Sequence, residues 1–486
     1  MNQVDQPTSG TPKNSSTPSD KNRFDTLAIS PELLGVIAEI GYLTMTEIQA
    51  KAIPLLLAGR DVIGQSKTGS GKTAAFGIPL LQKIRVQDRR VQALVMCPTR
   101  ELCTQVAREI RNLGRRQQGL QVLVVCGGQP VAPQAFALEK GVHIVVGTPG
   151  RILDHIRRSS IQLSRLSTVV LDEADRMLDM GFQEDMETIL AESPASRQTV
   201  FFSATFPDSI GEMSATYQKD PVSVTIENTD ESKADIHQVL YEAATENKSV
   251  LLQGLLQQIA PKSTIVFSNF KAAVVELTAQ LEKAGVSAGC IHGDLLQVDR
   301  DKIMARFRNQ SIRVLVATDV AARGIDVADL DLVVNYDLPQ KPETYVHRIG
   351  RTGRAGKKGL AISFATPKEA YRVNGIEVHT GTKFEREKFN VAAETKMQKT
   401  EKSKHAEALM ATIHISGGRK HKMRPGDILG ALTGEAGGLE ASEIGKIEIH
   451  DMFSYVAVSS RLAKIACEAL RNGRIKGRKF NVDLVR

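Results

Sequence analysis

The sequence predicts an α/β protein with two tandem parallel-sheet domains, followed by a small α+β domain. Three observations lead to this prediction. Runs rich in Val, Ile and Leu alternate with helical stretches from about residue 60 to 366, as in parallel sheets covered on both faces. A polar break near 227–234 divides these runs into two groups. After residue 409 the element order changes, and at 486 residues the chain has room for roughly three domains.

The N-terminal segment 1–22, MNQVDQPTSGTPKNSSTPSDKN, predicts a disordered leader. It is rich in Ser, Thr, Pro and Asn and lacks the apolar core of a secretory signal. No run of about 18 apolar residues occurs, so no contact with a membrane is expected. The five cysteines form no CxxC pair, which argues against a structural metal and a disulfide framework and favours a cytoplasmic location.

The two sheet domains are expected at 23–226 and 235–382, with a charged linker at 383–408 and the last domain at 409–486. In each sheet domain a polar cluster follows directly after a strand, so it lies at the carboxyl end of the sheet, where α/β folds bind ligands. The expected strands include 93–99, 121–128, 143–150, 168–175 and 199–205 in the first domain, and 264–269, 290–294, 313–319, 332–337 and 360–366 in the second.

The segment SKTGSGKT (66–73) predicts a phosphate-binding loop between a strand and a helix. Its glycines allow backbone N–H groups to close around phosphate oxygens at a helix N-terminus. Lys72 would reach the β- and γ-phosphates, and the Thr73 hydroxyl would bind Mg²⁺. The strict pattern has Gly at position 66, so an unrelated Gly-rich turn is the alternative. The predicted phosphate contacts are Ser66, Lys67, Thr68, Gly69, Ser70, Gly71, Lys72 and Thr73.

The segment LDEAD (171–175) ends a later strand and supplies the second half of such a site. Asp172 would hold Mg²⁺ through water, and Glu173 would orient or deprotonate the attacking water. Acidic residues that only complement a helix dipole are the alternative. Together with the loop, the segment predicts an NTPase that uses ATP and Mg²⁺.

The second sheet domain has no phosphate loop but contains HRIGRTGR (347–354), with three arginines in eight residues. Arginines supplied from a facing surface stabilise charge on a transferring γ-phosphate, an effect of about 10³–10⁵ in rate. A solvated basic loop is the alternative. We therefore expect ATP between the two halves and hydrolysis that depends on their closure.

Eight motifs in this order and spacing resemble the DEAD-box ATP-dependent RNA helicases, over residues 23–382. The resemblance implies two RecA-like domains and ATP-dependent remodelling of RNA. The motifs are GYLTMTEIQ (41–49), SKTGSGKT, PTREL (98–102), TPGR (148–151), DEAD (172–175), SAT (203–205), ATDVAARGID (317–326) and HRIGRTGR.

The resemblance also implies roles for individual residues. Phe24 would stack near adenine, and Thr46 with Gln49 would read its edge. Asp326 would bind the ribose, Gly324 would also contribute to the ATP site, and Arg351 and Arg354 would act as arginine fingers. The residues expected to couple nucleotide state to RNA binding are Asp175, Ser203, Thr205, His347 and Arg348.

By the same resemblance, RNA would lie across the top of both halves. Such contacts to phosphate and sugar position a strand without reading its sequence. Closure would bend one strand and separate only a few base pairs, without long processive unwinding. The implied contacts are Thr99, Arg100, Gly128, Thr148 and Arg151 in the first half, and Gly293, Gln297, Arg300 and Thr318 in the second.

The last domain has the expected order βαββαβ, which resembles the RNA-recognition fold. From residue 409 it carries 13 Lys and Arg against 8 Asp and Glu, which favours a polyanionic partner. The strands that usually stack bases offer only His414 and Tyr455, and Asp427 is expected to cap the first helix. RNA is therefore expected at the basic loops, through Arg419, Lys420, Lys422, Arg424, Arg474, Lys476, Arg478 and Lys479.

RPGDILGAL, IGKI, YVAV and KGRKF make this domain similar to that of the bacterial DbpA subfamily. The resemblance implies recognition of hairpin 92 of 23S ribosomal RNA and local unwinding of short duplexes during assembly of the large ribosomal subunit. Large-subunit precursors are then the expected partners, and a monomer the expected state. The alternatives are an ATP-dependent RNA clamp or scaffold, an RNA helicase without rRNA specificity, and a DNA helicase of related fold.

Overall fold

The computed structural model describes residues 22–66, 69–226, 235–322, 329–353, 358–388, 408–434 and 437–485. The chain divides into two compact units, Met1–Asn228 and Thr229–Arg486. The first contains one parallel sheet, and the second contains a parallel sheet and a smaller antiparallel sheet.

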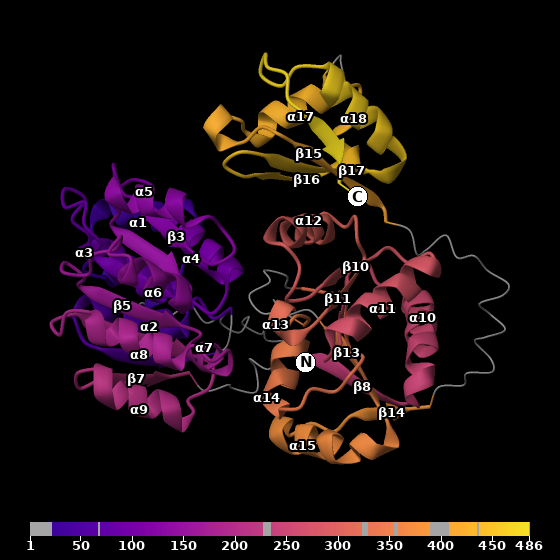
Figure 1. Cartoon of the computed structure of the whole chain (residues 1–486), viewed down its shortest axis with the longest axis horizontal. Helices are drawn as coiled ribbons and strands as arrows, with labels where there is room; N and C mark the ends of the chain where they lie inside the picture. The colour runs from indigo at the N-terminus through magenta and orange to yellow at the C-terminus, as the bar shows by residue number, and fades with distance from the viewer. Residues whose placement is uncertain are drawn as a thin grey trace, which may run out of the picture. The chain divides into compact units, whose positions relative to one another are not determined.

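The sheet of the first unit has seven parallel strands in the order β3-β4-β2-β5-β6-β1-β7 (Figure 1). Its central strands are short and buried on both faces, because helices cover each side. The strands are β1 (Val62–Gln65), β2 (Ala93–Met96), β3 (Val122–Val125), β4 (Ile144–Gly147), β5 (Thr168–Asp172), β6 (Gln198–Ser203) and β7 (Val222–Thr225).

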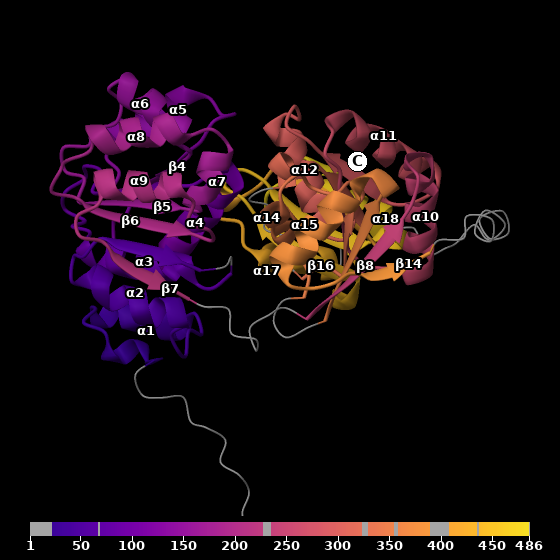
Figure 2. The same ribbon diagram turned by 90° about the horizontal axis from the view of Figure 1, so that it is seen from below.

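Figure 2 shows the helices of this unit in two layers, with the strands between them. One apolar core joins the sheet to α1–α4, and a second core joins its other face to α6–α9. The helices are α1 (Pro31–Glu39), α2 (Glu47–Leu57), α3 (Lys72–Lys83), α4 (Arg100–Leu113), α5 (Val131–Glu139), α6 (Pro149–Arg157), α7 (Ala174–Asp179), α8 (Gln183–Glu192) and α9 (Asp208–Tyr217).

The parallel sheet of the second unit has the order β10-β11-β9-β12-β13-β8-β14. Its strand β14 (Glu385–Glu387) pairs with β8 at the sheet edge, although the sequence assigns these residues to the linker. A solvent-exposed ERE segment has no apolar alternation, so its pairing leaves no sequence signal. The other strands are β8 (Ile236–Glu242), β9 (Thr264–Phe267), β10 (Ala288–Ile291), β11 (Val314–Ala317), β12 (Leu332–Asn335) and β13 (Gly359–Ala365).

Helices again cover both faces of this second sheet. One core joins the sheet to α10 and α11, and two others join its opposite face to the remaining helices. The helices are α10 (Lys248–Ile259), α11 (Lys271–Lys283), α12 (Gln297–Arg308), α13 (Asp319–Ala322), α14 (Pro342–Ile349) and α15 (Ala370–Thr380).

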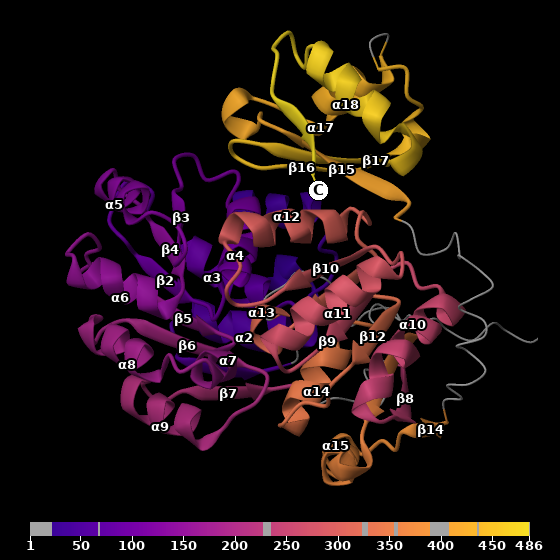
Figure 3. The ribbon, with the colours of Figure 1, turned by 45° about the vertical axis from the view of Figure 1, so that its right-hand side comes forward.

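The antiparallel sheet has the order β16-β17-β15-β18, and Figure 3 shows α17 and α18 on one side of it. The strands β16 and β17 form an antiparallel hairpin, with a bulge after Ile444. Asp427 lies in the first turn of α17, where its carboxylate accepts the Arg424 backbone N–H at 2.8 Å. The elements are β15 (Met410–Ile415), α17 (Pro425–Thr433), β16 (Ile444–Ile449), β17 (Ser454–Ser459), α18 (Ala463–Asn472) and β18 (Val482–Leu484).

The predicted fold class is confirmed: two parallel sheets with helices on both faces precede a βαββαβ domain. The strands β7 and β8 are absent from the predicted set. Of the predicted leader and linker, residues 1–21 and 389–407 lie outside the described part of the chain.

Candidate functional site

The loop between β1 and α3 lies at the carboxyl end of the first sheet. Gly69 and Gly71 have φ values of 81° and 91°, a region that glycine adopts without a steric penalty. A Cβ on Gly71 would lie 2.5 Å from the amide nitrogen of Gln49. Lys72 is buried at the first position of α3, and its Nζ donates to the carbonyl oxygen of Ser66 at 2.9 Å. The loop thus combines left-handed glycines with a lysine at a helix N-terminus.

Helix α2 supports this loop from one side. The Thr46 hydroxyl donates to the Ser70 carbonyl at 2.8 Å, and the Gln49 amide donates to the Gly71 carbonyl at 3.1 Å. Gln49 also accepts the Thr46 backbone N–H, so both ends of its amide are engaged. Phe24 is buried and stacks beside Tyr42, with ring centroids 6.3 Å apart. Contacts of these residues with adenine stay a prediction.

The end of β5 places two acidic residues next to the loop. Burial raises the pKa of Asp172 to about 7, against the opposing effect of the Lys72 ammonium. In the described part of the chain, Oδ1 of Asp172 is buried and has no hydrogen-bond partner. Glu173 adopts a left-handed conformation, with φ of 56°, and accepts a hydrogen bond from Arg176 at 2.8 Å.

An unpaired, buried carboxylate oxygen beside a lysine is a group that a bound cation or its water would satisfy. Thr73 lies on the first turn of α3, near Glu109, whose pKa is raised by burial against a hydrogen bond from Tyr42. Thr73 and Asp172 together therefore form a donor set that fits Mg²⁺.

Asp175 joins the acidic strand end to the next strand of the sheet. Its Oδ2 accepts hydrogen bonds from the backbone N–H and the hydroxyl of Thr205, both at 2.9 Å. Its backbone N–H donates to the Ser203 hydroxyl at 3.3 Å. Three of the predicted coupling residues, Asp175, Ser203 and Thr205, are therefore in direct contact within the first unit.

The predicted RNA contacts of the first unit lie at helix starts and turns that follow β2, β3 and β4. Thr99 and Thr148 are the N-cap residues of α4 and α6. Gly128 has φ of 73°, and a Cβ there would lie 3.5 Å from Nη1 of Arg100. That Nη1 is buried and has no hydrogen-bond partner among the described residues. Arg151 donates to the Gln129 carbonyl and to the Gln134 side chain.

The predicted RNA contacts of the second unit follow β10 and β11. Gln297 begins α12 and bonds to Asp301 at 2.8 Å, and Arg300 donates to the Ala321 carbonyl at 3.0 Å. Thr318 accepts the Ala322 N–H, and a Cβ on Gly293 would meet no atom within 4 Å. These residues lie at the carboxyl ends of two neighbouring strands.

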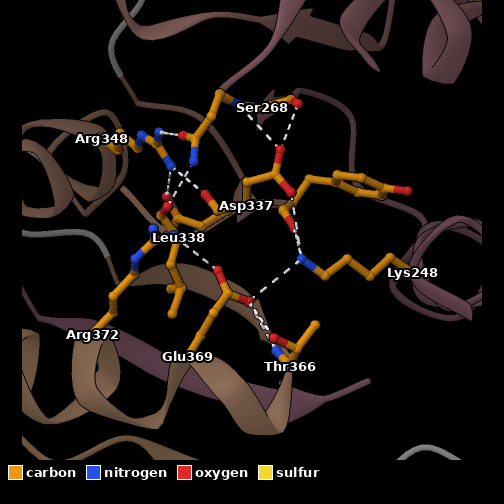
Figure 4. Close-up of polar contacts among 11 residues, drawn as sticks. Lys248, Ser268, Asp337, Leu338, Arg348, Thr366, Glu369 and Arg372 are labelled. Atoms are coloured by element: carbon orange, nitrogen blue, oxygen red, sulfur yellow. Dashed lines mark hydrogen bonds and ion pairs between the residues drawn. The ribbon is translucent and has the colours of Figure 1, made fainter. Parts of the chain in front are cut away.

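Arg348 is the centre of a closed polar network in the second unit (Figure 4). Its side chain is 1% exposed and forms two hydrogen bonds to Asp319, at 2.6 and 2.7 Å. It also donates to Asn269 and Asn335 and to the Asp337 carbonyl. The predicted role of Arg348 in coupling the two halves would act through these neighbours, because its guanidinium is enclosed.

Lys248 extends this network and is a residue that sequence reasoning missed. Its Nζ lies 3.4 Å from Asp337, 4.0 Å from Glu369 and 3.0 Å from the Tyr336 carbonyl, as Figure 4 shows. Lysine at the start of α10 has no motif around it. Only the topology points to Lys248, because β8, the strand before it, occupies the same place in its sheet as β1 does in the first sheet.

The two basic clusters of the C-terminal domain lie side by side. Lys476 donates to the Lys422 carbonyl at 3.0 Å, and its Nζ lies 3.7 Å from Asp427. The eight predicted basic residues are all exposed: Arg419, Lys420, Lys422, Arg424, Arg474, Lys476, Arg478 and Lys479.

The open face of the C-terminal sheet is covered within the second unit. Thr412 and Tyr455 point away from α17 and α18, because their strand neighbours pack on these helices, yet they are only 1% and 4% exposed. The Thr412 hydroxyl bonds to Ser311 at 2.7 Å. Arg308, at the end of α12, forms two hydrogen bonds to Glu448, at 2.9 and 3.0 Å.

This covering explains the missing aromatics of the RNA-recognition pattern. His414, His450, Phe453 and Tyr455 form a ring cluster. With Tyr455 and Thr412 buried, the middle of this face packs against protein. Tyr455 thus packs against protein, and no pattern in the sequence indicates the contact with α12.

Five of the predicted site residues lie in other parts of the chain. Lys67, Thr68, Gly324, Asp326 and Arg354 lie outside the described residues. His347 lies on α14, and Arg351 follows that helix and accepts the Leu330 N–H at its backbone oxygen.

Three family models match successive parts of the chain. They are the DEAD/DEAH box helicase over residues 46–213, the helicase conserved C-terminal domain over 247–356 and the DbpA RNA binding domain over 412–484. The ATP-dependent RNA helicase DbpA of Escherichia coli is 48% identical over 95% of this chain and 99% of its own length. The chain belongs to the DbpA-like DEAD-box RNA helicases. It is thus an ATP-hydrolysing RNA helicase with an RNA-binding domain.

Other relatives agree with this family. The DEAD-box ATP-dependent RNA helicase CshA of Geobacillus kaustophilus is 47% identical over 75% of this helicase and 78% of its own length. A solved structure of Saccharomyces cerevisiae Dbp5 L327V, which is bound to RNA and ADP BeF3, has a TM-score of 0.68 at 32% identity. It covers 78% of this chain and 99% of its own. In the described part of the helicase, no helix is both long and apolar enough to cross a bilayer.

Proposed function

We propose that this helicase hydrolyses ATP at the carboxyl edge of its first sheet, and that its C-terminal basic loops direct it to hairpin 92 of 23S ribosomal RNA. It would locally unwind short duplexes during assembly of the large ribosomal subunit. The proposed location is the cytoplasm, which the free thiols of all five cysteines support, and the proposed state is a monomer.

The proposed nucleotide site uses the residues at the ends of β1 and β5. Lys72 would exchange its bond to the Ser66 carbonyl for β- and γ-phosphate oxygens, and the N–H groups of the loop would surround these oxygens. Thr73 and Asp172 would hold Mg²⁺, which when bound neutralises charge on the phosphates. Glu173 would orient the attacking water and take its proton, a role that requires release of its bond to Arg176.

The proposed response to RNA connects this site to the strand ends around it. Asp175, Ser203 and Thr205 form one contact network next to Glu173, so a change at one of them would reach the proposed general base. RNA phosphates would bind at Thr99, Arg100 and Arg151 and, in the second unit, at Arg300 and Thr318. Arg351 and Arg354 would stabilise the charge that develops on the γ-phosphate.

One observation carries the rRNA target: two exposed basic loops lie together, while the middle of the sheet face beside them is buried. Bases splayed across this sheet would have to displace α12. A folded hairpin presents closely spaced phosphates, which match a cluster of exposed lysines and arginines. The loops thus favour a structured RNA as the target.

The test compares single charge reversals in full-length protein. Lys420→Glu and Lys479→Glu change one residue in each basic loop, and Lys464→Glu makes the same charge change at an exposed position of α18. The RNA-stimulated ATPase is measured with an RNA that contains hairpin 92 and with one of equal length without a hairpin.

We expect the wild type to have a much lower KM for the hairpin RNA. Each loop variant should raise that KM about three- to tenfold, because phosphate contacts are lost. Lys464→Glu should leave it unchanged. Equal KM values of the wild type for both RNAs would contradict the rRNA target, while leaving the RNA helicase activity intact.

A further inference from the structure

A buried polar cluster surrounds Arg151, which the proposed function assigns to an RNA phosphate. The Arg151 side chain is 13% exposed. Its Nη1 donates to the Gln129 carbonyl at 3.0 Å and to Oε1 of Gln134 at 3.1 Å. Its Nε lies 3.8 Å from Asp154. The guanidinium is therefore held on one side by protein groups.

Gln134 connects three segments of the first unit. It lies on α5 and is buried. Its Nε2 donates to the Cys126 carbonyl at 3.2 Å, which fixes the amide so that Oε1 points to Arg151. The same Oε1 lies 3.0 Å from Nε2 of His155, on α6. One oxygen thus accepts from a guanidinium and from an imidazole.

The protonation of His155 follows from its partners. Gln134 offers an oxygen, so Nε2 of His155 must carry the proton. Burial lowers the pKa of His155, and the nearby Arg151 lowers it further, so the ring is neutral at pH 7. Nδ1 then accepts from the Ser160 hydroxyl at 2.7 Å, and the same hydroxyl lies 3.1 Å from the His155 carbonyl oxygen as a second acceptor. With this tautomer the Ser160 hydroxyl donates to Nδ1 of His155, and Nε2 of His155 donates to Oε1 of Gln134.

We propose that Gln134 and His155 are positioning residues that hold Arg151 ready for an RNA phosphate. This inference rests on the proposed function, which makes Arg151 an RNA contact. A long arginine side chain loses rotamer freedom when it binds, and a guanidinium that is already oriented loses less. Gln134 and His155 make no contact with RNA themselves and act only by orienting the Arg151 guanidinium.

The position of the cluster supports this role. Cys126 follows β3 and Thr148 follows β4, so the cluster lies beneath the edge where RNA is proposed to bind. Arg100, next to Gly128 at this edge, has a buried Nη1 without a partner in the described residues. The edge therefore holds one arginine that is fully oriented and one with an unused donor.

The test uses the full-length protein and a double-mutant cycle. The variants are Gln134→Met, Arg151→Ala and their combination, with Gln218→Met as the matched control. Gln218 is equally buried in the same unit and also forms three side-chain hydrogen bonds, to Ser214, Val62 and Thr199. Binding of a short oligouridylate is measured with a non-hydrolysable ATP analogue, together with thermal unfolding and the RNA dependence of the ATPase.

Arg151→Ala should weaken RNA binding about tenfold and reduce the slope of log Kd against log salt by about one. Gln134→Met should weaken binding about fivefold, raise KM for RNA and leave kcat at saturating RNA unchanged. In the Arg151→Ala background, Gln134→Met should have no further effect on binding. Gln218→Met should lower thermal stability about as much as Gln134→Met does, without changing RNA affinity.

Each part of the inference has its own contradicting result. If Gln134→Met weakens binding equally with and without Arg151, it does not act through Arg151 and the inference fails. If Arg151→Ala leaves RNA affinity unchanged, the proposed RNA contact fails instead. His155→Phe, which keeps a ring but removes the donor to Gln134, should change RNA affinity in the same direction as Gln134→Met. Unchanged RNA affinity of a folded His155→Phe variant would exclude His155 from the role.

Discussion

The two parallel sheets have matching strand orders and carry like charges at corresponding positions, but these charges have different partners in each sheet. β1 and β8 are each sixth along their sheets, and β5 and β12 are each fourth. A buried lysine begins the helix after the sixth strand in both, Lys72 in α3 and Lys248 in α10. An aspartate lies at the end of the fourth strand in both, Asp172 in one sheet and Asp337 just beyond the other.

In the second sheet these charges are satisfied by protein. Lys248 approaches Asp337 and Glu369, and Asp337 also accepts the hydroxyl of Ser268 at 2.7 Å. In the first sheet Lys72 bonds to a backbone carbonyl, and Asp172 keeps a buried oxygen without a partner among the described residues. The proposed nucleotide site therefore lies at the edge where a buried carboxylate oxygen has no partner among the described residues. At the corresponding edge of the second sheet, Glu369 supplies a countercharge to Lys248, and these charges are paired within the protein.

The largest expected effect concerns Glu173, at the carboxyl edge of the first sheet. Glu173→Gln should lower kcat of the RNA-stimulated ATPase about 10²–10⁴-fold, because a general base is lost. The variant should still bind RNA tightly with ATP, since Lys72 and the loop are unchanged. Rapid-quench measurement of phosphate release checks this, with Glu187→Gln, on α8, as the control. Turnover near the wild-type rate would assign the base to another residue.

The next largest effect concerns Arg348, in the polar network of the second sheet. Arg348→Met should lower the free energy of unfolding of the second unit by about 3–5 kcal/mol, because the partly buried Asp319 and the buried Asn335 lose their partner. Denaturant unfolding with a probe in the second unit measures this change. A variant as stable as the wild type would show that the Arg348 network is not needed for the fold.

Lys248→Met should cost less, about 2–3 kcal/mol, because Asp337 keeps its bond to Ser268 and Glu369 keeps its bond to Thr366. Its ATPase per folded molecule should stay close to that of the wild type. Lys248→Arg is the control that retains the charge. An ATPase defect without loss of stability would contradict a purely internal role for Lys248.

The smallest effect concerns the contact between α12 and the C-terminal sheet. Burial would raise the pKa of Glu448, but hydrogen bonds from Arg308 and Lys446 outweigh it and hold the pKa at about 2. This carboxylate therefore contributes stability above its unfolded pKa, and the contribution is lost as the pH falls toward 2.

Glu448→Gln should lower the unfolding free energy at pH 7 by about 1 kcal/mol. The difference from the wild type should shrink as the pH falls from 5 to 2, because the unfolded chain protonates Glu448 in this range while the folded protein does so only near pH 2. Urea unfolding across this pH range measures it, with Glu468→Gln, at an exposed position of α18, as the control. A difference independent of pH would show that the charge of Glu448 is not what stabilises the contact.

Local patterns in the sequence were sufficient for the fold class and for the motif-bearing strand ends. Continuous apolar runs located the central strands, and the loop around Lys72 has a spacing that few other structures produce. Strand β14 escaped prediction because its charged residues pair only through the backbone. Lys248 and Glu369 escaped because their role depends on three strands that are distant in the sequence. The contact between Arg308 and Glu448 depends on tertiary packing, which no local pattern encodes.

The most direct test of the comparison measures nucleotide binding by a matched pair of variants, Lys72→Met and Lys248→Met. A fluorescent ATP analogue is titrated into each folded protein in the presence of Mg²⁺. We predict that Lys72→Met weakens binding at least about a hundredfold, the effect of losing a charge-assisted phosphate contact in a site of low dielectric. Lys248→Met should bind like the wild type. Equal losses in both variants, or a loss only in Lys248→Met, would contradict the assignment of the nucleotide to the first sheet.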